Sequence, residues 1–259
     1  MSKIINSSGE EADFTKPLYV PIKRRSFFMY AGATAGATAL LLSGCNDDDD
    51  AGVTPEGTVN VGSGSVGVLN YAYALEQLEA GFYTALRDGT YYKGLMAGSA
   101  EKQILDDLYY HEVIHREFFK AALTRDAASA MIRSDLQPNF DGIDFNARVT
   151  AAGSAKLGVL NAAKAFEDLG VAAYNGAGRF IATDTAGLNY LVAAGKIVSV
   201  EARHAALIRD LVSEGSFVDS DVVRIGTDGL EISKTPAEVV ATANLFLKEG
   251  SKLNVSGLV

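Results

Sequence analysis

The amino-acid sequence predicts an all-α protein, an up-down bundle of four long helices with one long connection and an extra C-terminal helix. Two observations support this prediction. First, the chain repeats itself after 91 residues, because VLNYAYALEQLEAGFY at Val68–Tyr83 aligns with VLNAAKAFEDLGVAAY at Val159–Tyr174. Second, four long segments carry apolar residues at helical spacing. A duplicated pair of long antiparallel helices is the organisation of a four-helix bundle.

Residues 1–44 are predicted to be an export signal rather than part of the fold. Arg24 and Arg25 precede an apolar run that is too short for a membrane span, which needs about 20 residues. This segment resembles a twin-arginine signal, and the Leu-Ser-Gly-Cys tetrad ending at Cys45 resembles a bacterial lipobox. The resemblance implies lipidation of Cys45 and membrane anchoring on the periplasmic side of a bacterial cell envelope. Residues 45–64, rich in Asp and Gly, are expected to form a flexible acidic tether.

The folded body is expected to span residues 65–250. Its helices begin and end at typical capping and breaking residues: Ser99 is the expected N-cap of the second helix, and Asp88-Gly89 ends the first. The predicted helices cover residues 65–87, 99–125, 154–181 and 185–212.

The second and third helices are joined by a long connection, residues 126–153, which contains Pro138 and Asp141-Gly142 as turn residues. A connection of this length can cross from one end of the bundle to the other. A last helix begins at Thr235-Pro236, because proline suits the first helical turn. It is expected to reach about residue 248 and to pack on the bundle.

Each repeat carries one glutamate, followed by a Glu-x-x-His motif on the next helix. A Glu and a His three positions apart lie on one helix face, so the four helices can direct four carboxylates and two imidazoles inward. Four carboxylates balance two divalent cations, two of them can bridge the ions, and each imidazole completes one coordination shell. Without metal, four buried glutamates would repel one another. The candidate metal ligands are Glu76, Glu112, His115, Glu167, Glu201 and His204.

Other residues near these glutamates need an interpretation. Glu79 competes with Glu76 for the ligand position, but only Glu76 aligns with a glutamate in the second repeat, whereas Glu79 aligns with Gly170. Tyr83 and Tyr174 follow the repeat glutamates by seven residues, two turns along the same face. They are candidates for hydrogen bonds to ligand carboxylates or for electron relay, and ordinary core packing explains their spacing equally well.

This ligand pattern is similar to that of the ferritin-like superfamily. In particular, the chain resembles exported ferritin-like proteins related to plant desiccation-associated proteins, over residues 65–250. The resemblance implies a four-helix bundle that holds two iron or manganese ions, with Glu112 and Glu201 bridging them. The chain lacks the Cys-x-x-Cys electron-transfer domain of rubrerythrin. Its expected tether and C-terminal extension set it apart from cage-forming storage ferritins.

One motif favours a different chemistry. His111-Glu112-Val-Ile-His115 matches the zinc-peptidase pattern, in which two histidines bind zinc and the glutamate acts as general base. The repeat argues against this alternative, because Val200 stands where a second such histidine would be. The peptidase interpretation also leaves the other four candidate ligands without a role.

Composition narrows the classes of function. The 259 residues include 23 basic and 32 acidic side chains and have a formal net charge of −9, which argues against a nucleic-acid partner. Two classes stay open. One is an enzyme that uses the metal pair with oxygen or peroxide to oxidise ferrous iron or a small substrate. The other is a non-catalytic stress-protection or interaction protein whose bundle is metal-stabilised or metal-free. Either class is compatible with a homo-oligomer.

Overall fold

The computed structural model describes residues 57–259, most of which are helical. The predicted signal segment, Cys45 and residues 45–56 of the expected tether lie outside the described residues. Export and lipidation therefore stay predictions. None of the helices between residues 57 and 259 combines the length and apolar character that a membrane crossing requires.

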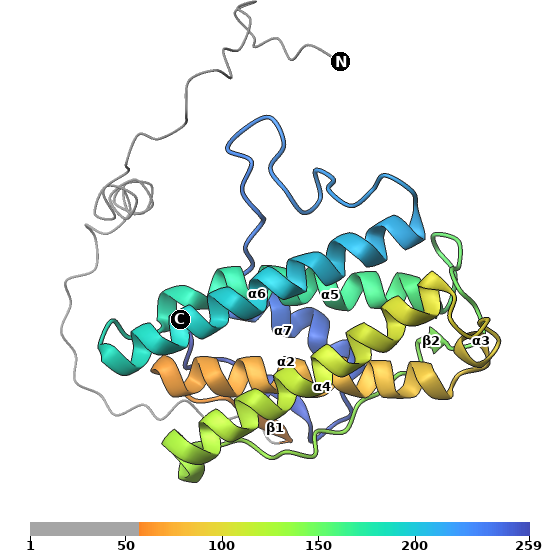
Figure 1. The fold of residues 1–259 in the computed structure, drawn as a ribbon. Coiled ribbons are helices and arrows are strands. Elements are labelled where there is room, and N and C mark those ends of the chain that lie inside the picture. Colours follow the sequence, from red (N-terminus) through yellow and green to blue (C-terminus); the bar gives the residue numbers. More distant parts are fainter. Residues whose placement is uncertain (1–56) are drawn as a thin grey trace, which may run out of the picture. The chain divides into compact units, whose positions relative to one another are not determined.

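Four long helices form the body of the fold, as predicted (Figure 1). The α2 helix packs along α4, and α5 packs along α6, so the repeat corresponds to two helical hairpins. Ser99 caps α4 by accepting a hydrogen bond from the backbone N–H of Lys102, and Asp184 caps α6 in the same way with Gly187. The helices are α2 (Gly64–Asp88), α4 (Ala100–Ala127), α5 (Val159–Ala177) and α6 (Thr185–Val212).

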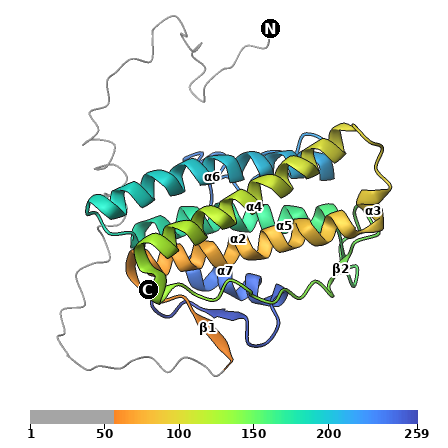
Figure 2. The ribbon, with the colours of Figure 1, turned by 60° about the horizontal axis from the view of Figure 1, so that its bottom comes forward.

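The third helix begins at Val159, so the predicted start at residue 154 is wrong. The preceding residues form a short strand, β3 (Leu157–Gly158), which pairs in parallel with β2 (Ile143–Asp144). A side chain at Gly158 would lie 2.7 Å from the backbone of Val149, so the chain approaches itself too closely there for a helical turn with side chains. The long connection between α4 and α5 is confirmed (Figure 2).

The C-terminal helix is also shorter than predicted. The α7 helix (Pro236–Ala243) starts with the expected proline and a capping box between Thr235 and Glu238. It continues only as a 3₁₀ turn, η3 (Asn244–Phe246), because Asn244 then fixes the returning chain through hydrogen bonds to the backbone of Leu253.

Several short elements were not predicted. A one-turn helix, α3 (Thr90–Lys93), follows α2, and the strand β4 (Lys252–Asn254) pairs in parallel with β1 (Thr58–Asn60). The β1 strand lies inside the segment expected to be a tether. The fold therefore includes residues 58–64 at its start and extends past residue 250 at its end.

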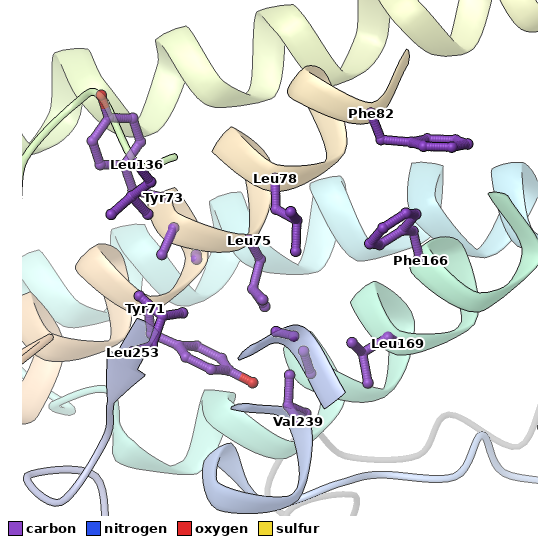
Figure 3. Close-up of a cluster of buried hydrophobic side chains, with 14 of the residues drawn as sticks. Tyr71, Tyr73, Leu75, Leu78, Phe82, Leu136, Phe166, Leu169, Val239 and Leu253 are labelled. Atoms are coloured by element: carbon purple, nitrogen blue, oxygen red, sulfur yellow. The ribbon is translucent and has the colours of Figure 1, made fainter. Parts of the chain in front are cut away.

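The apolar core surrounds α2 and α5. Figure 3 shows Leu75, Leu78 and Phe82 of α2 near Phe166 and Leu169 of α5. The α7 helix packs on α5, on the side of the α2–α5 pair away from α4 and α6 (Figure 2). Helices α2 and α5 are thus covered on two sides and are mostly buried, whereas α4 and α6 keep an exposed outer face. Polar side chains of α2 and α5 that face α4 and α6 are enclosed in the bundle.

Candidate metal centre

The six predicted ligands converge in the middle of the bundle. They form two groups of four residues, and within each group the ligand atoms lie within 4.8 Å of one another. Glu112 and Glu201 belong to both groups, which is the arrangement expected of a bridging pair. The first group is Glu76, Glu112, His115 and Glu201, and the second is Glu112, Glu167, Glu201 and His204.

The histidine of each Glu-x-x-His motif contacts the glutamate of the other motif. Nδ1 of His115 on α4 lies 2.7 Å from Oε1 of Glu201 on α6. Nδ1 of His204 on α6 lies 2.8 Å from Oε1 of Glu112 on α4. Each shared glutamate therefore reaches the histidine of the opposite hairpin, as well as the histidine three residues on in its own helix. The carboxylates of Glu112 and Glu201 therefore lie next to both histidines, at the centre of the six candidate ligands.

Most of these ligand atoms have no hydrogen-bond partner. Within residues 57–259, ten buried side-chain nitrogen or oxygen atoms lack one, and eight of them belong to the six candidate ligands. The short contacts between Nδ1 atoms and carboxylates do not have hydrogen-bond geometry. Buried polar atoms in native proteins are nearly always satisfied, and convergent carboxylates and imidazoles are a common donor set for iron, manganese and zinc. The residues therefore fit a pair of metal ions.

Burial and mutual repulsion change the proton affinity of the carboxylates. Burial, together with the neighbouring Glu201 and Glu112, raises the pKa of Glu76 well above its usual value. Burial likewise raises the pKa of Glu167 to about 8, against the opposing influence of His204. In the metal-free protein these two outer carboxylates tend to hold protons, which a bound cation would displace.

The pKa values of Glu112 and His115 shift differently, because in each case a group of opposite charge lies next to the buried side chain. Burial would raise the pKa of Glu112, but His115 and His204 lower it to about 2. Burial would lower the pKa of His115, but Glu112 and Glu201 raise it to about 9. The metal-free site thus stabilises itself by pairing imidazolium groups with central carboxylates, which is the charge pattern that two cations would replace.

Both predicted tyrosines donate hydrogen bonds to ligand carboxylates, and each does so across the repeat. The hydroxyl of Tyr83 on α2 donates to Oε1 of Glu167 on α5, at 2.5 Å. The hydroxyl of Tyr174 on α5 donates to Oε1 of Glu76 on α2. Burial, followed by the nearby carboxylate, raises the pKa of each tyrosine, so each keeps the proton that it donates. Hydrogen bonding, rather than core packing alone, is thus their role in the structure.

Glu79 is buried next to the site but belongs to neither ligand group. A side chain at Gly170 would lie 2.9 Å from Oε1 of Glu79, so these two equivalent positions of the repeat face each other across the bundle. A side chain at position 170 would displace the carboxyl group of Glu79 from its present place. The choice of Glu76 over Glu79 as the ligand of α2 agrees with this geometry.

His111 lies at the surface and contacts a candidate ligand directly. It belongs to neither ligand group, and its Nδ1 lies 2.8 Å from Nε2 of His204, with the two rings stacked at an angle of 14°. A zinc-peptidase site requires His111 and His115 to bind one ion together. Among the described residues these two histidines do not form such a group, so the peptidase arrangement is not assembled. The only sequence signal for the contact is the position of His111 directly before Glu112.

Comparison with known proteins agrees with the fold. A sequence model described as the ferritin-like domain matches residues 64–214, which contain all four long helices and all six candidate ligands. A search of curated proteins found no match. The match covers more than half of the chain, and the helical hairpins and convergent glutamates of the structure agree with it. The chain belongs to the ferritin-like domain family.

Proposed function

We propose that this protein holds two iron or manganese ions in the bundle and uses them to react with oxygen or peroxide. The observation that carries the proposal is that two ligand groups share Glu112 and Glu201. Glu76 and His115 would complete the first coordination shell, and Glu167 and His204 the second. No other described residues gather into a group of this kind.

The chain's own residues prepare this site in several ways. When bound, a pair of redox-active ions supplies electrons for the reduction of oxygen or peroxide. Glu112 and Glu201 would hold both ions and supply the negative charge that two cations need. Tyr83 and Tyr174 fix the outer carboxylates and hold protons next to the site. The electrons would come from ferrous iron or from a small oxidisable molecule, which gives a protective function under oxidative or desiccation stress.

The metal proposal is tested by loading metal-free protein with ferrous iron without oxygen, counting bound ions, and then measuring oxygen uptake. We expect two ions per chain and rapid oxygen consumption. Glu112→Gln should lose both ions because it removes a ligand that both share. Glu117→Gln is the matched control, since Glu117 is an exposed residue of the same helix.

Two results would contradict parts of this proposal. Binding of a single zinc ion, with no iron or manganese at any loading, would exclude a metal pair. Binding of two ions without oxygen uptake would leave the non-catalytic role, in which metal only stabilises the bundle.

We further propose that the protein is exported and anchored by lipid at Cys45. Support comes from the order of Arg24-Arg25, the apolar run and the Leu-Ser-Gly-Cys tetrad in the sequence. Cys45→Ser should abolish incorporation of labelled fatty acid and move the protein from the membrane fraction to the soluble fraction. Equal membrane retention of this variant and the wild type would contradict the anchor.

A further inference from the structure

The two histidine ligands have different surroundings on the side that faces away from the carboxylates. The side chain of His204 is 3% exposed, and that of His115 is 12% exposed. His111, itself at the surface, covers His204 and contacts its Nε2. Among the described residues, no side chain forms a corresponding hydrogen bond with Nε2 of His115. Both ring nitrogens of His204 therefore contact other side chains, whereas among the described residues His115 has such contacts through Nδ1.

From this difference we infer that His111 is a positioning residue that makes the two metal positions unequal. It holds His204 so that the ion bound by Glu167 and His204 binds more tightly and exchanges more slowly than the ion bound by Glu76 and His115. This inference rests on the proposed metal pair. It also gives a role to the histidine that had suggested a zinc peptidase.

The hydrogen bond between the two histidines has the geometry that a ligand needs. Nδ1 of His204 points to the carboxylates of Glu112, Glu201 and Glu167, at distances of 2.8, 3.2 and 3.4 Å. When Nδ1 holds a metal ion, the ring proton is on Nε2, which then donates to Nδ1 of His111. Such support fixes the tautomer and the ring orientation of a histidine ligand, and its loss typically lowers metal affinity about 10- to 100-fold.

His115 instead lies beside an open groove between α4 and α6. The groove is a cavity of about 360 Å³, large enough for water, ions or a small molecule. The groove reaches the side chain of His115, which is 12% exposed, whereas the side chain of His204 is 3% exposed. The side chains that line it with His115 include Ile114, Phe118, Val192, Lys196 and Ile197.

The repeat supplies matched variants for a test. His111 and Val200 each directly precede a shared glutamate, so they are counterparts in the two hairpins. His111→Val makes the two positions alike by removing the contact. His111→Gln keeps a hydrogen-bond acceptor. Val200→His offers His115 the contact that it lacks.

The first experiment titrates the metal-free full chain with Co²⁺ without oxygen and follows the visible absorption of the bound ion. The wild type should bind two ions in steps at least about tenfold apart in affinity. His111→Val should weaken the tight step by about tenfold or more and change the weak step less, while His111→Gln should restore most of the difference. Val200→His should strengthen the weak step. Circular dichroism checks that each variant is folded.

The second experiment follows release of Co²⁺ to a chelator in excess. Two phases are expected, and Val192→Trp should slow the fast phase several-fold by filling the groove, whereas Leu207→Trp on the exposed face of α6 should not. Equal rates in these two variants would overturn the groove as the route of exchange.

The outcomes separate this inference from the proposal beneath it. A wild type that binds fewer than two Co²⁺ ions contradicts the metal pair and, with it, the inference. Two ions of equal affinity, or equal weakening of both steps by His111→Val, contradict the inference alone. Loss of the step difference in His111→Val, with its recovery in His111→Gln, supports it, because a merely structural effect would not depend on the acceptor.

Discussion

The α2–α4 and α5–α6 hairpins supply the same ligands in the same order, but the residues beside those ligands differ. Glu79 in the first hairpin has Gly170 as its counterpart in the second, and His111 has Val200. In the fold, Glu79 fills the space left by Gly170, and His111 contacts the imidazole of the opposite hairpin. The comparison shows that the repeat preserves the ligands, while inequality of the two halves arises from the positions next to them.

The largest effect is expected from making the halves alike at Glu79 and Gly170. Gly170→Glu would place two buried carboxylates against each other, because even a Cβ at this position lies 2.9 Å from Oε1 of Glu79. We expect the free energy of unfolding of the metal-free protein to fall by about 3 kcal/mol or more, because a second carboxyl group would be crowded into the core without a partner. Urea unfolding followed by circular dichroism measures the change.

Gly195→Glu is the control for this variant, since a side chain at Gly195 of α6 meets open space. It should leave stability unchanged or raise it slightly, because glycine is a poor residue for a helix interior. If Gly170→Glu stays within about 1 kcal/mol of the wild type, the close approach of the two halves is wrong.

A second expected effect is on the pH dependence of stability, with and without metal. The pKa of Glu167 is raised to about 8 from a usual 4.5, and that of His115 to about 9 from 6.5. Both groups bind protons more strongly in the folded state, so the stability they contribute is present at low pH and is lost as pH rises toward 8–9. The lowered pKa of Glu112, about 2, adds no change in this range.

The Tm of the metal-free protein should therefore fall between pH 5 and pH 8, owing to these groups. Metal binding needs deprotonated ligands, so the gain in Tm on adding metal should grow over the same range. Thermal unfolding with and without Mn²⁺ at each pH measures this gain. A gain that shrinks with rising pH would show that these carboxylates and His115 are not the ligands.

A smaller effect should distinguish the two tyrosines. Tyr83 is fully buried and Tyr174 is half-buried, although both donate to a ligand carboxylate of the other hairpin. Tyr83→Phe should lower the free energy of unfolding by about 1 kcal/mol, and Tyr174→Phe by less, as expected for hydrogen bonds to protonated carboxyl groups. The exposed Tyr110 provides the control Tyr110→Phe. Equal, negligible changes in all three variants would argue against the crossed hydrogen bonds.

The smallest expected effect compares the N-caps of α4 and α6. The backbone N–H of Gly187 lies 2.7 Å from Oδ1 of Asp184, whereas that of Lys102 lies 3.4 Å from Oγ of Ser99. Asp184→Ala should cost about 1 kcal/mol and Ser99→Ala about 0.5 kcal/mol. Chemical denaturation resolves this difference if the two variants are measured together, and the reverse order would contradict the cap geometry.

The sequence was sufficient to predict the four long helices and the convergence of the candidate ligands, for physical reasons. Helical periodicity and capping residues are local signals, and the start and end of the fourth predicted helix agree with α6. The ligand set followed from the repeat, because Glu76 aligns with Glu167 and each Glu-x-x-His recurs. Placing two residues three positions apart on one helix face requires no knowledge of the tertiary structure.

Features that depend on contacts distant in sequence were not predicted. The pairing of Thr58–Asn60 with Lys252–Asn254 joins the two ends of the fold and carries no local signal. The early start of the third helix was wrong because close backbone approach at Gly158 depends on a neighbouring loop. Likewise, the contact of His111 with His204 depends on how the two hairpins pack, which spacing alone does not define.

The central claim is that both hairpins contribute to one shared metal pair. It is tested most directly by counting ferrous ions bound at saturation, without oxygen, in Glu112→Ala/His115→Ala, Glu201→Ala/His204→Ala, His111→Ala and the wild type. We predict two ions in the wild type and in His111→Ala, and less than one in each double variant, because each loses a shared carboxylate and an imidazole. Retention of one ion in Glu201→Ala/His204→Ala, with its loss in His111→Ala, would contradict the shared pair and support a zinc site on α4.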